Sequence, residues 1–209
     1  MMKSRVEIKL QAKAGLMSNY GLALGSTILY MVVGSVLATV GFGVAAVILA
    51  GPLFSFVAWA VLCIYRGQPC SIAEAASRSV EEIGRKIGGY LWMELWIFLW
   101  SLVFVIPGIV KTYSYAMTPY ILTDMPDIPA KEALKLSMRM MRGHKAELFV
   151  FHLSFVGWAI LSSFTFGLLA LLYVGPYMQI ATAGFYDEVK QDAVRRGILV
   201  SVQEPYMAY

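Results

Sequence analysis

The sequence predicts an all-α membrane protein, with six transmembrane helices arranged as three pseudo-repeated hairpins and with amphipathic cytoplasmic interfacial helices. The first observation is a gap in the charges, because the fifty-two residues 14–65 contain no Asp, Glu, Lys or Arg. A bilayer core about 30 Å thick is crossed by roughly 20 helical residues, so this stretch is long enough for two crossings. The second observation is composition: 59% of the residues are hydrophobic and 14% are charged, against about 25% charged in a typical soluble domain.

Glycine and proline divide the chain, treated as one polytopic domain 1–209, into six apolar segments. Proline removes a backbone hydrogen bond, so Gly51-Pro52 predicts a kink inside the second segment. The fourth segment is the shortest; its 15 residues rise only about 22 Å as a helix, so a re-entrant loop competes with a full crossing. The predicted spans are 20–40, 44–65, 89–106, 109–123, 148–166 and 168–186.

The basic residues decide in favour of six crossings. Lys and Arg favour the cytoplasmic ends of membrane spans. With six spans, 16 of the 17 basic residues lie on one side, in the N-terminal segment, two connections and the tail, and only Lys111 is left over. A re-entrant fourth segment would place the basic stretch 124–145 on the opposite side. We therefore expect a multi-pass protein with both termini in the cytoplasm.

Three segments near the cytoplasmic side have the pattern of amphipathic helices: about 3–17, 71–87 and 128–143. The second begins with Ser71-Ile72-Ala73-Glu74, a capping-box pattern in which the serine closes the first turn. Such helices lie in the plane of the interface, with the apolar side toward acyl chains and the basic side toward anionic headgroups. The alternative is that they pack across the cytoplasmic mouth of the bundle, and the two arrangements are compatible.

A repeated unit of amphipathic helix, span, glycine turn and proline-containing span recurs along the chain. Glu74-Ala75 matches Glu132-Ala133 at an offset of 58 positions, and Pro119-Tyr120 matches Pro176-Tyr177 at an offset of 57. Either the chain arose by duplication, or hairpins built under the same bilayer constraints look alike. Repeats are common in transporters, whose binding sites often lie where repeats meet.

The stretch 107–158, followed by 175–190 (GPYMQIATAGFYDEVK), resembles a bacterial family of integral membrane proteins that is catalogued only as a domain of unknown function. The resemblance implies a six-span protein of the bacterial cytoplasmic membrane and supplies no activity, cofactor or catalytic residue. The architecture is also similar to the membrane domain found beside some glycerophosphodiester phosphodiesterases. The soluble catalytic part of those enzymes is absent here, so the resemblance implies no phosphodiesterase activity.

Ionisable residues inside a span cost about 2.5–3.5 kcal/mol at its centre and are candidates for function. Glu94 lies opposite the stripe of Trp92, Trp96 and Trp100 on the third span, and Ser101 shares its face. His152 occupies the matching repeat position on the fifth span, where Ser163 continues its face. A Glu94–His152 pair would form a proton-linked site at a repeat interface. The alternative is ordinary interhelical hydrogen bonding, or a side chain that reaches toward the headgroups.

Basic residues at the predicted interfaces are candidates for lipid contact. Lys111 follows the Pro107-Gly108 turn, so we expect it to reach the outer interface as an anchor. The other candidates line the basic side of the 128–143 helix: Lys131, Lys135, Arg139 and Arg142.

The sequence contains no catalytic motif, and we expect no enzyme activity, cofactor or nucleic-acid partner. Cys63 and Cys70 lack the spacing of a metal site. The favoured hypothesis is a permease-like protein that binds or moves an amphipathic substrate, such as a lipid or a peptide. The alternative is a non-transporting membrane interaction, assembly or immunity-type protein. Membrane lipids are expected partners, and a homo-oligomer or another membrane protein is left open. A cavity that reaches mid-bilayer beside Glu94 would favour the first, and a solidly packed bundle the second.

Overall fold

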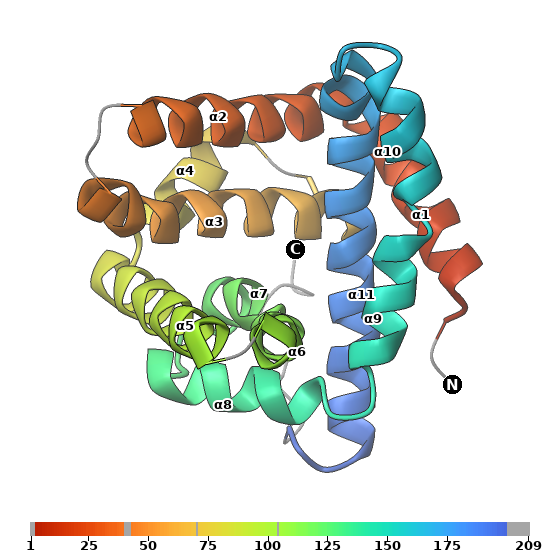
Figure 1. Cartoon of the computed structure of the whole chain (residues 1–209). Helices are drawn as coiled ribbons and strands as arrows, with labels where there is room; N and C mark the ends of the chain where they lie inside the picture. Colours follow the sequence, from red (N-terminus) through yellow and green to blue (C-terminus); the bar gives the residue numbers. More distant parts are fainter. Residues whose placement is uncertain (1–2, 40–42, 70, 104, 200–209) are drawn as a thin grey trace.

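The computed structural model describes residues 3–39, 43–69, 71–103 and 105–199, and within these ranges all regular structure is helical (Figure 1). The all-α prediction is therefore confirmed. The elements in chain order are α1 (Arg5–Ser18), α2 (Tyr20–Thr39), α3 (Gly43–Arg66), α4 (Ile72–Val80), α5 (Ile83–Val103), α6 (Val105–Tyr115), α7 (Thr118–Asp124), α8 (Ala130–Met140), α9 (Lys145–Leu153), α10 (Val156–Ser163), the π-helical turn η1 (Ala170–Val174) and α11 (Gly175–Arg195).

The predicted apolar segments all correspond to helices, but several are divided. The first three become α2, α3 and the later part of α5, whereas the fourth is split into α6 and α7, the fifth into α9 and α10, and the sixth into η1 and α11. Within the described residues, one segment is long and apolar enough to cross a membrane, Lys145–Ser163, which joins α9 and α10. Tyr20–Leu29 and Ala50–Arg66 are shorter apolar helices. Residues 40–42, where the first predicted span ends, and Cys70 lie outside the described residues.

The helices pair as hairpins, but the hairpins do not form a bundle of parallel segments. Neighbours in sequence pack together in α2 with α3, in α5 with α6 and in α10 with η1. Figure 1 shows α2 and α3 side by side, with α11 running across their ends rather than along them. The expected arrangement of three equivalent hairpins differs from this packing, because α11 contacts α1, α2, α3 and α8 along its length.

Helix α3 is continuous through Pro52, which lies inside the second predicted span. The preceding Gly51 explains part of the local packing, since a Cβ atom at this position would lie 2.9 Å from the Lys86 carbonyl oxygen of α5. At the other end of α3, Gly184 of α11 lies against the ring of Tyr65, and a Cβ atom there would overlap the ring. Two glycines therefore set how closely α3 approaches its neighbours.

The main core forms where α1, α3, α7, α9 and α11 meet. Its fully buried side chains include Ile8, Ile64, Ile121, Phe151 and Tyr186. Aromatic rings fill much of this volume: Phe151 packs against Phe185 with ring centroids 5.8 Å apart. Because side chains from five helices interlock here, the core fixes the ends of α3, α7 and α11 relative to one another.

The three predicted amphipathic helices have different surroundings. Helix α1 buries Ile8, Ala12 and Leu16, and α8 buries its apolar face against α5, α6, α7 and α11. For these two helices, packing against the protein is confirmed. Helix α4 leaves Ile72 and Val80 uncovered, with 61% and 59% of each residue exposed.

The predicted 71–87 helix also ends early. Ser71 caps α4 as predicted, since its hydroxyl accepts a hydrogen bond from the Glu74 amide at 3.1 Å. The chain then turns at Glu82, which has a positive φ of 49°, and Ile83 already belongs to α5. The turn at Gly167, where φ is 81°, agrees with the predicted break between the fifth and sixth segments.

Large apolar side chains are exposed over α2, α5, α6, α9 and α10. Phe98 on α5 is 65% exposed, and Phe164 after α10 is 80% exposed. Trp92 and Trp100 of the tryptophan stripe are also exposed, by 41% and 37%. We call this exposed surface the apolar girdle; its largest members on α5 and α10 are Trp92, Leu95, Phe98, Leu99, Trp100, Trp158, Ile160 and Leu161.

Candidate functional site

A cluster of charged side chains joins the ends of three helices. Arg66 ends α3, Asp124 ends α7 and Asp187 lies in α11. The Arg66 guanidinium donates from Nη1 to Asp124 Oδ1 at 2.8 Å and from Nη2 to Asp187 Oδ1 at 2.6 Å. Such paired bonds from the planar guanidinium are geometrically specific. One arginine thus ties together segments that are far apart in the sequence.

Two further groups of α11 complete the cluster. Lys190 donates from Nζ to Asp124 Oδ2 at 2.7 Å, and the Tyr186 hydroxyl donates to the same oxygen at 2.9 Å. The side chain of Asp124 is only 5% exposed. Two cations balance two carboxylates, so the cluster carries no net charge. Buried ion pairs of this kind are costly to break, because removing one partner leaves an uncompensated charge.

The pKa values of Asp124 and Asp187 shift in opposite directions, although both carboxyl groups bind Arg66. Burial raises the pKa of Asp124, but the hydrogen bonds and charges of Arg66 and Lys190 outweigh it and hold the pKa at about 2. Burial also raises the pKa of Asp187, and there the bonds from Arg66 offset it only in part, so the pKa stays above its usual value. The difference follows from the partners, because Asp124 accepts from Arg66, Lys190 and Tyr186.

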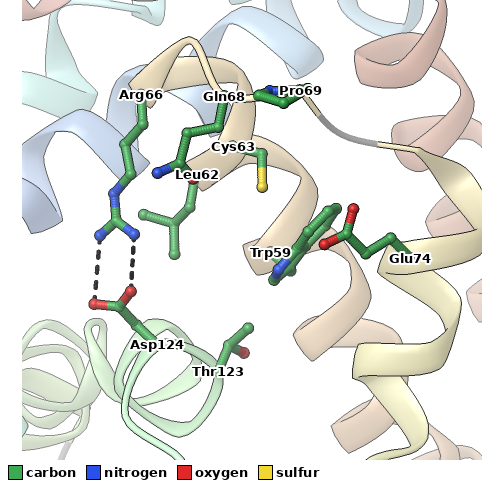
Figure 2. A pocket seen from close by; sticks show the side chains of 9 residues that line it. All are labelled: Trp59, Leu62, Cys63, Arg66, Gln68, Pro69, Glu74, Thr123 and Asp124. Carbon is green, nitrogen blue, oxygen red and sulfur yellow. Dashed lines mark hydrogen bonds and ion pairs between the residues drawn. The ribbon is translucent and has the colours of Figure 1, made fainter. Parts of the chain in front are cut away.

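A cavity of about 260 Å³ adjoins this cluster, between α3, α4 and the end of α7 (Figure 2). In Figure 2 the Glu74 carboxylate points toward Trp59, and the Arg66–Asp124 pair closes the opposite side. The walls combine apolar and polar groups: Trp59, Leu62, Cys63, Arg66, Gln68, Pro69, Glu74, Thr123 and Asp124.

The electrostatics of the cavity depend on Glu74. Its carboxylate makes no ion pair with any residue that the structure describes, whereas Asp124 is already engaged. The lining therefore carries one uncompensated negative charge beside an indole ring. This combination suits an ammonium group or another cation attached to an apolar body. Within the described ranges, no three His, Cys, Asp or Glu side chains gather closely enough to hold a metal ion.

The structure does not bring Glu94 and His152 together. Glu94 is half-buried on α5, and no hydrogen bond or ion pair joins these two described residues. His152 on α9 instead lies with Nε2 3.5 Å from the Thr182 hydroxyl of α11. Its ring also packs near Tyr113, with centroids 6.0 Å apart. The proton-linked role of the pair remains a prediction without a shared contact.

The two candidate serines are both at the surface. The Ser101 hydroxyl donates to the Ile97 carbonyl of its own helix at 2.8 Å, and Gly108 of α6 packs directly against Ser101. Ser163 is exposed, whereas its neighbour Ser162 is buried. Ser163 is therefore not buried on a common face with His152. The reason is that α10 packs chiefly against η1, which leaves most of its surface uncovered.

The structure places three of the predicted lipid contacts together. Lys111, Lys131 and Lys135 line one groove, so Lys111 lies beside the basic helix α8 and not on the opposite side from it. The expectation that Lys111 reaches a separate outer interface is wrong in this respect, because α8 packs along α5 and α6 instead of lying apart from them. Arg139 and Arg142 are exposed elsewhere on the 128–143 segment.

Sequence reasoning missed the charged cluster, although a signal for it was present. Arg66, Asp124 and Asp187 are each the first charged residue after a predicted span. These are the second, fourth and sixth spans, which end on the same side in a six-span order. Charged residues that follow three spans on the same side are candidates for ion pairs with one another.

Comparison with known proteins agrees with the predicted resemblance to an uncharacterised family. Residues 53–193 match the family described as "Protein of unknown function (DUF975)". The match contains the whole charged cluster and every residue that lines the cavity. No curated protein and no solved structure gives a match to the chain.

Proposed function

The chain belongs to the family described as protein of unknown function (DUF975), and we propose that it is a multi-pass protein of the bacterial cytoplasmic membrane that binds an amphipathic molecule. In this proposal hydrocarbon surrounds the apolar girdle and both termini lie in the cytoplasm. The cavity beside Arg66 receives the polar end of the ligand. Movement of the ligand across the membrane would make the protein permease-like.

The apolar girdle supports the membrane location. Each Å² of apolar surface in water costs about 25 cal/mol. Side chains such as Phe98, Ile160 and Phe164 would be unfavourable in water and favourable in hydrocarbon. The charge-free stretch 14–65 supports the same location.

The observation that carries the binding function is the mixed lining of the cavity. Trp59 and Leu62 offer apolar walls, and Glu74 supplies a carboxylate with no ion-pair partner among the described residues. An amphipathic cation would place its charged end by Glu74 and its apolar part along Trp59. A cation over an exposed indole gains about 0.5–1 kcal/mol, and an exposed ion pair adds at most about 1 kcal/mol. We therefore expect weak binding, which suits a ligand that must also be released.

Binding of dodecyltrimethylammonium to the chain in zwitterionic nanodiscs tests this proposal by calorimetry, with empty nanodiscs subtracted. The Glu74→Gln variant should weaken binding by up to about fivefold, as expected for losing at most about 1 kcal/mol. Glu81→Gln is the matched control, because Glu81 follows the same helix but does not line this cavity. Equal affinity for dodecyl sulfate, or no effect of Glu74→Gln, would contradict the proposed site.

One observation favours the alternative, a non-transporting interaction, assembly or immunity-type protein. Ile72 and Val80 on α4 are exposed and belong to the apolar side of that helix. A helix that keeps its apolar side uncovered can bind a membrane surface or a partner helix. Retention of membrane binding together with the absence of amphiphile binding would favour this alternative.

A further inference from the structure

A second concave site lies away from the cavity of Figure 2, between α5, α6 and α8. This groove has a volume of about 270 Å³. Three tryptophans of α5 form one wall, and residues of α6 and α8 form the other: Trp92, Trp96, Trp100, Lys111, Tyr115, Lys131, Leu134, Lys135 and Met138. We call it the Trp–Lys groove.

The Trp–Lys groove contains three positive charges without compensating carboxylates. Lys111, Lys131 and Lys135 form no ion pair with any residue in the described ranges. By contrast, Lys190 is held by Asp124 within the charged cluster. The ammonium of Lys111 lies 5.0 Å from the ring centroid of Trp100, so this cation is oriented by an aromatic face.

The surroundings of the groove add to its positive potential. Helix α9, which begins with Lys145, packs against α6, which carries Lys111. Lys131 and Lys135 lie one helical turn apart on α8 and are exposed. An anion that contacts all of these lysines would relieve their mutual repulsion.

The walls of the groove are apolar and continue into the apolar girdle. Leu134 and Met138 of α8 face the tryptophans, and Leu134 belongs to a small buried cluster with Met93 and Tyr115. Along the same helix α5, Leu95, Phe98 and Leu99 are exposed. A free inorganic anion would use the lysines but not the tryptophan wall. An anionic lipid would use both.

We propose that the Trp–Lys groove binds an anionic phospholipid of the surrounding bilayer. Lys111, Lys131 and Lys135 contact the phosphate oxygens, and the tryptophans pack against the glycerol region and the first methylenes. Basic residues near a membrane favour anionic headgroups by about fivefold for each lysine, and tryptophan is enriched at the level of the headgroups. The inference rests on the proposed membrane location and is independent of the ligand in the cavity beside Glu74.

Quenching of tryptophan fluorescence by brominated lipids in nanodiscs tests the proposal. Brominated phosphatidylglycerol should quench the wild-type chain at a lower mole fraction than brominated phosphatidylcholine. The triple variant Lys111→Gln, Lys131→Gln, Lys135→Gln should lose this preference. The triple variant Arg5→Gln, Lys13→Gln, Arg195→Gln removes the same charge from exposed positions on α1 and α11 and should keep it.

Two further variants distinguish loss of the binding site from loss of the fold. The variant with arginine at all three lysine positions should retain the preference, and the single exposed change Lys135→Gln should reduce it about fivefold. Equal quenching by both lipids, or an unchanged preference in the glutamine triple variant, would overturn the proposal. Competition by millimolar inorganic phosphate would assign the lysines to a free anion and overturn the lipid assignment. Recovery of the chain in detergent-free buffer would instead contradict the membrane location itself.

Discussion

Arg66 and Asp124 lie 58 positions apart in the sequence and face each other in a two-bond ion pair, with Nη1–Oδ1 at 2.8 Å and Nη2–Oδ2 at 3.3 Å (Figure 2). Arg66 follows the second predicted span and Asp124 follows the fourth. The same guanidinium also binds Asp187 after the sixth. One residue therefore holds together the ends of all three hairpins and forms a wall of the cavity.

Replacing Arg66 tests how much the charged cluster contributes to stability. Arg66→Met leaves two buried carboxylates with Lys190 as the remaining cation of the cluster, so we expect a loss of about 3–5 kcal/mol. The free energy of unfolding is measured for wild type and variant in detergent. Arg195→Met, at the exposed end of α11, should change stability by less than about 0.5 kcal/mol. A cost for Arg66→Met as small as that of the control would show that the cluster is not structural.

The cluster also predicts how stability depends on pH. The folded-state pKa of Asp124 is about 2, below the ordinary 3.8. Its contribution, about 2 kcal/mol by linkage, should be present above pH 4 and lost as the pH falls from about 4 toward 2. Unfolding curves of wild type and Asp124→Asn should therefore differ above pH 4 and converge below it. Curves that stay parallel down to pH 2 would contradict the assignment.

The contribution of Asp187 to stability depends on pH in the opposite direction to that of Asp124. Its pKa is raised in the folded state, so the protonated form is favoured by folding and the charged form lowers stability as the pH rises through that value. At pH 7, Asp187→Asn should therefore cost less free energy than Asp124→Asn. Unfolding of the two variants side by side measures this difference. A larger cost for Asp187→Asn would reverse our ranking of the two carboxylates.

Much of the fold could be predicted from the sequence because helix periodicity and turn residues act locally. The cap at Ser71, the turn at Gly167 and the burial of the apolar face of α8 all follow from residues within one or two turns. The break at Glu82 was not predictable in this way, since a glutamate with positive φ has no sequence signal of its own.

The site was harder to predict because its contacts are long-range. Arg66 meets Asp187 across 121 positions, and a helical pattern shows the face of a residue but not the helix opposite it. Lys111 shows the same limit: its sequence position indicated an isolated anchor, whereas the packing of α8 along α6 places it beside Lys131. Glu94 and His152 were paired by repeat position alone, and the helices that carry them have other neighbours.

The absence of a contact between Glu94 and His152 leads to a further prediction. Because no bond joins these residues, the effects of Glu94→Gln and His152→Ala on the free energy of unfolding should add within about 0.5 kcal/mol. A double-mutant cycle measures the coupling. A coupling above about 1 kcal/mol would restore the pair proposed from the sequence.

The close approach of α3 and α11 depends on Gly184. A methyl group there would meet the ring of Tyr65, and overpacking of this kind costs about 1–3 kcal/mol. Gly184→Ala should therefore lower the unfolding temperature. Gly157→Ala is the matched control, because a Cβ atom at Gly157 meets open space. It should leave the chain as stable as wild type or slightly more stable.

A spin label at position 98 tests whether hydrocarbon surrounds the apolar girdle. In a background that carries Cys63→Ser and Cys70→Ser, Phe98→Cys is labelled in nanodiscs, and its accessibility to oxygen is compared with that to a water-soluble nickel complex. Phe98 is 65% exposed on α5, and we expect high accessibility to oxygen and low accessibility to nickel. High accessibility to nickel at this position would place the girdle in water and exclude the proposed membrane location.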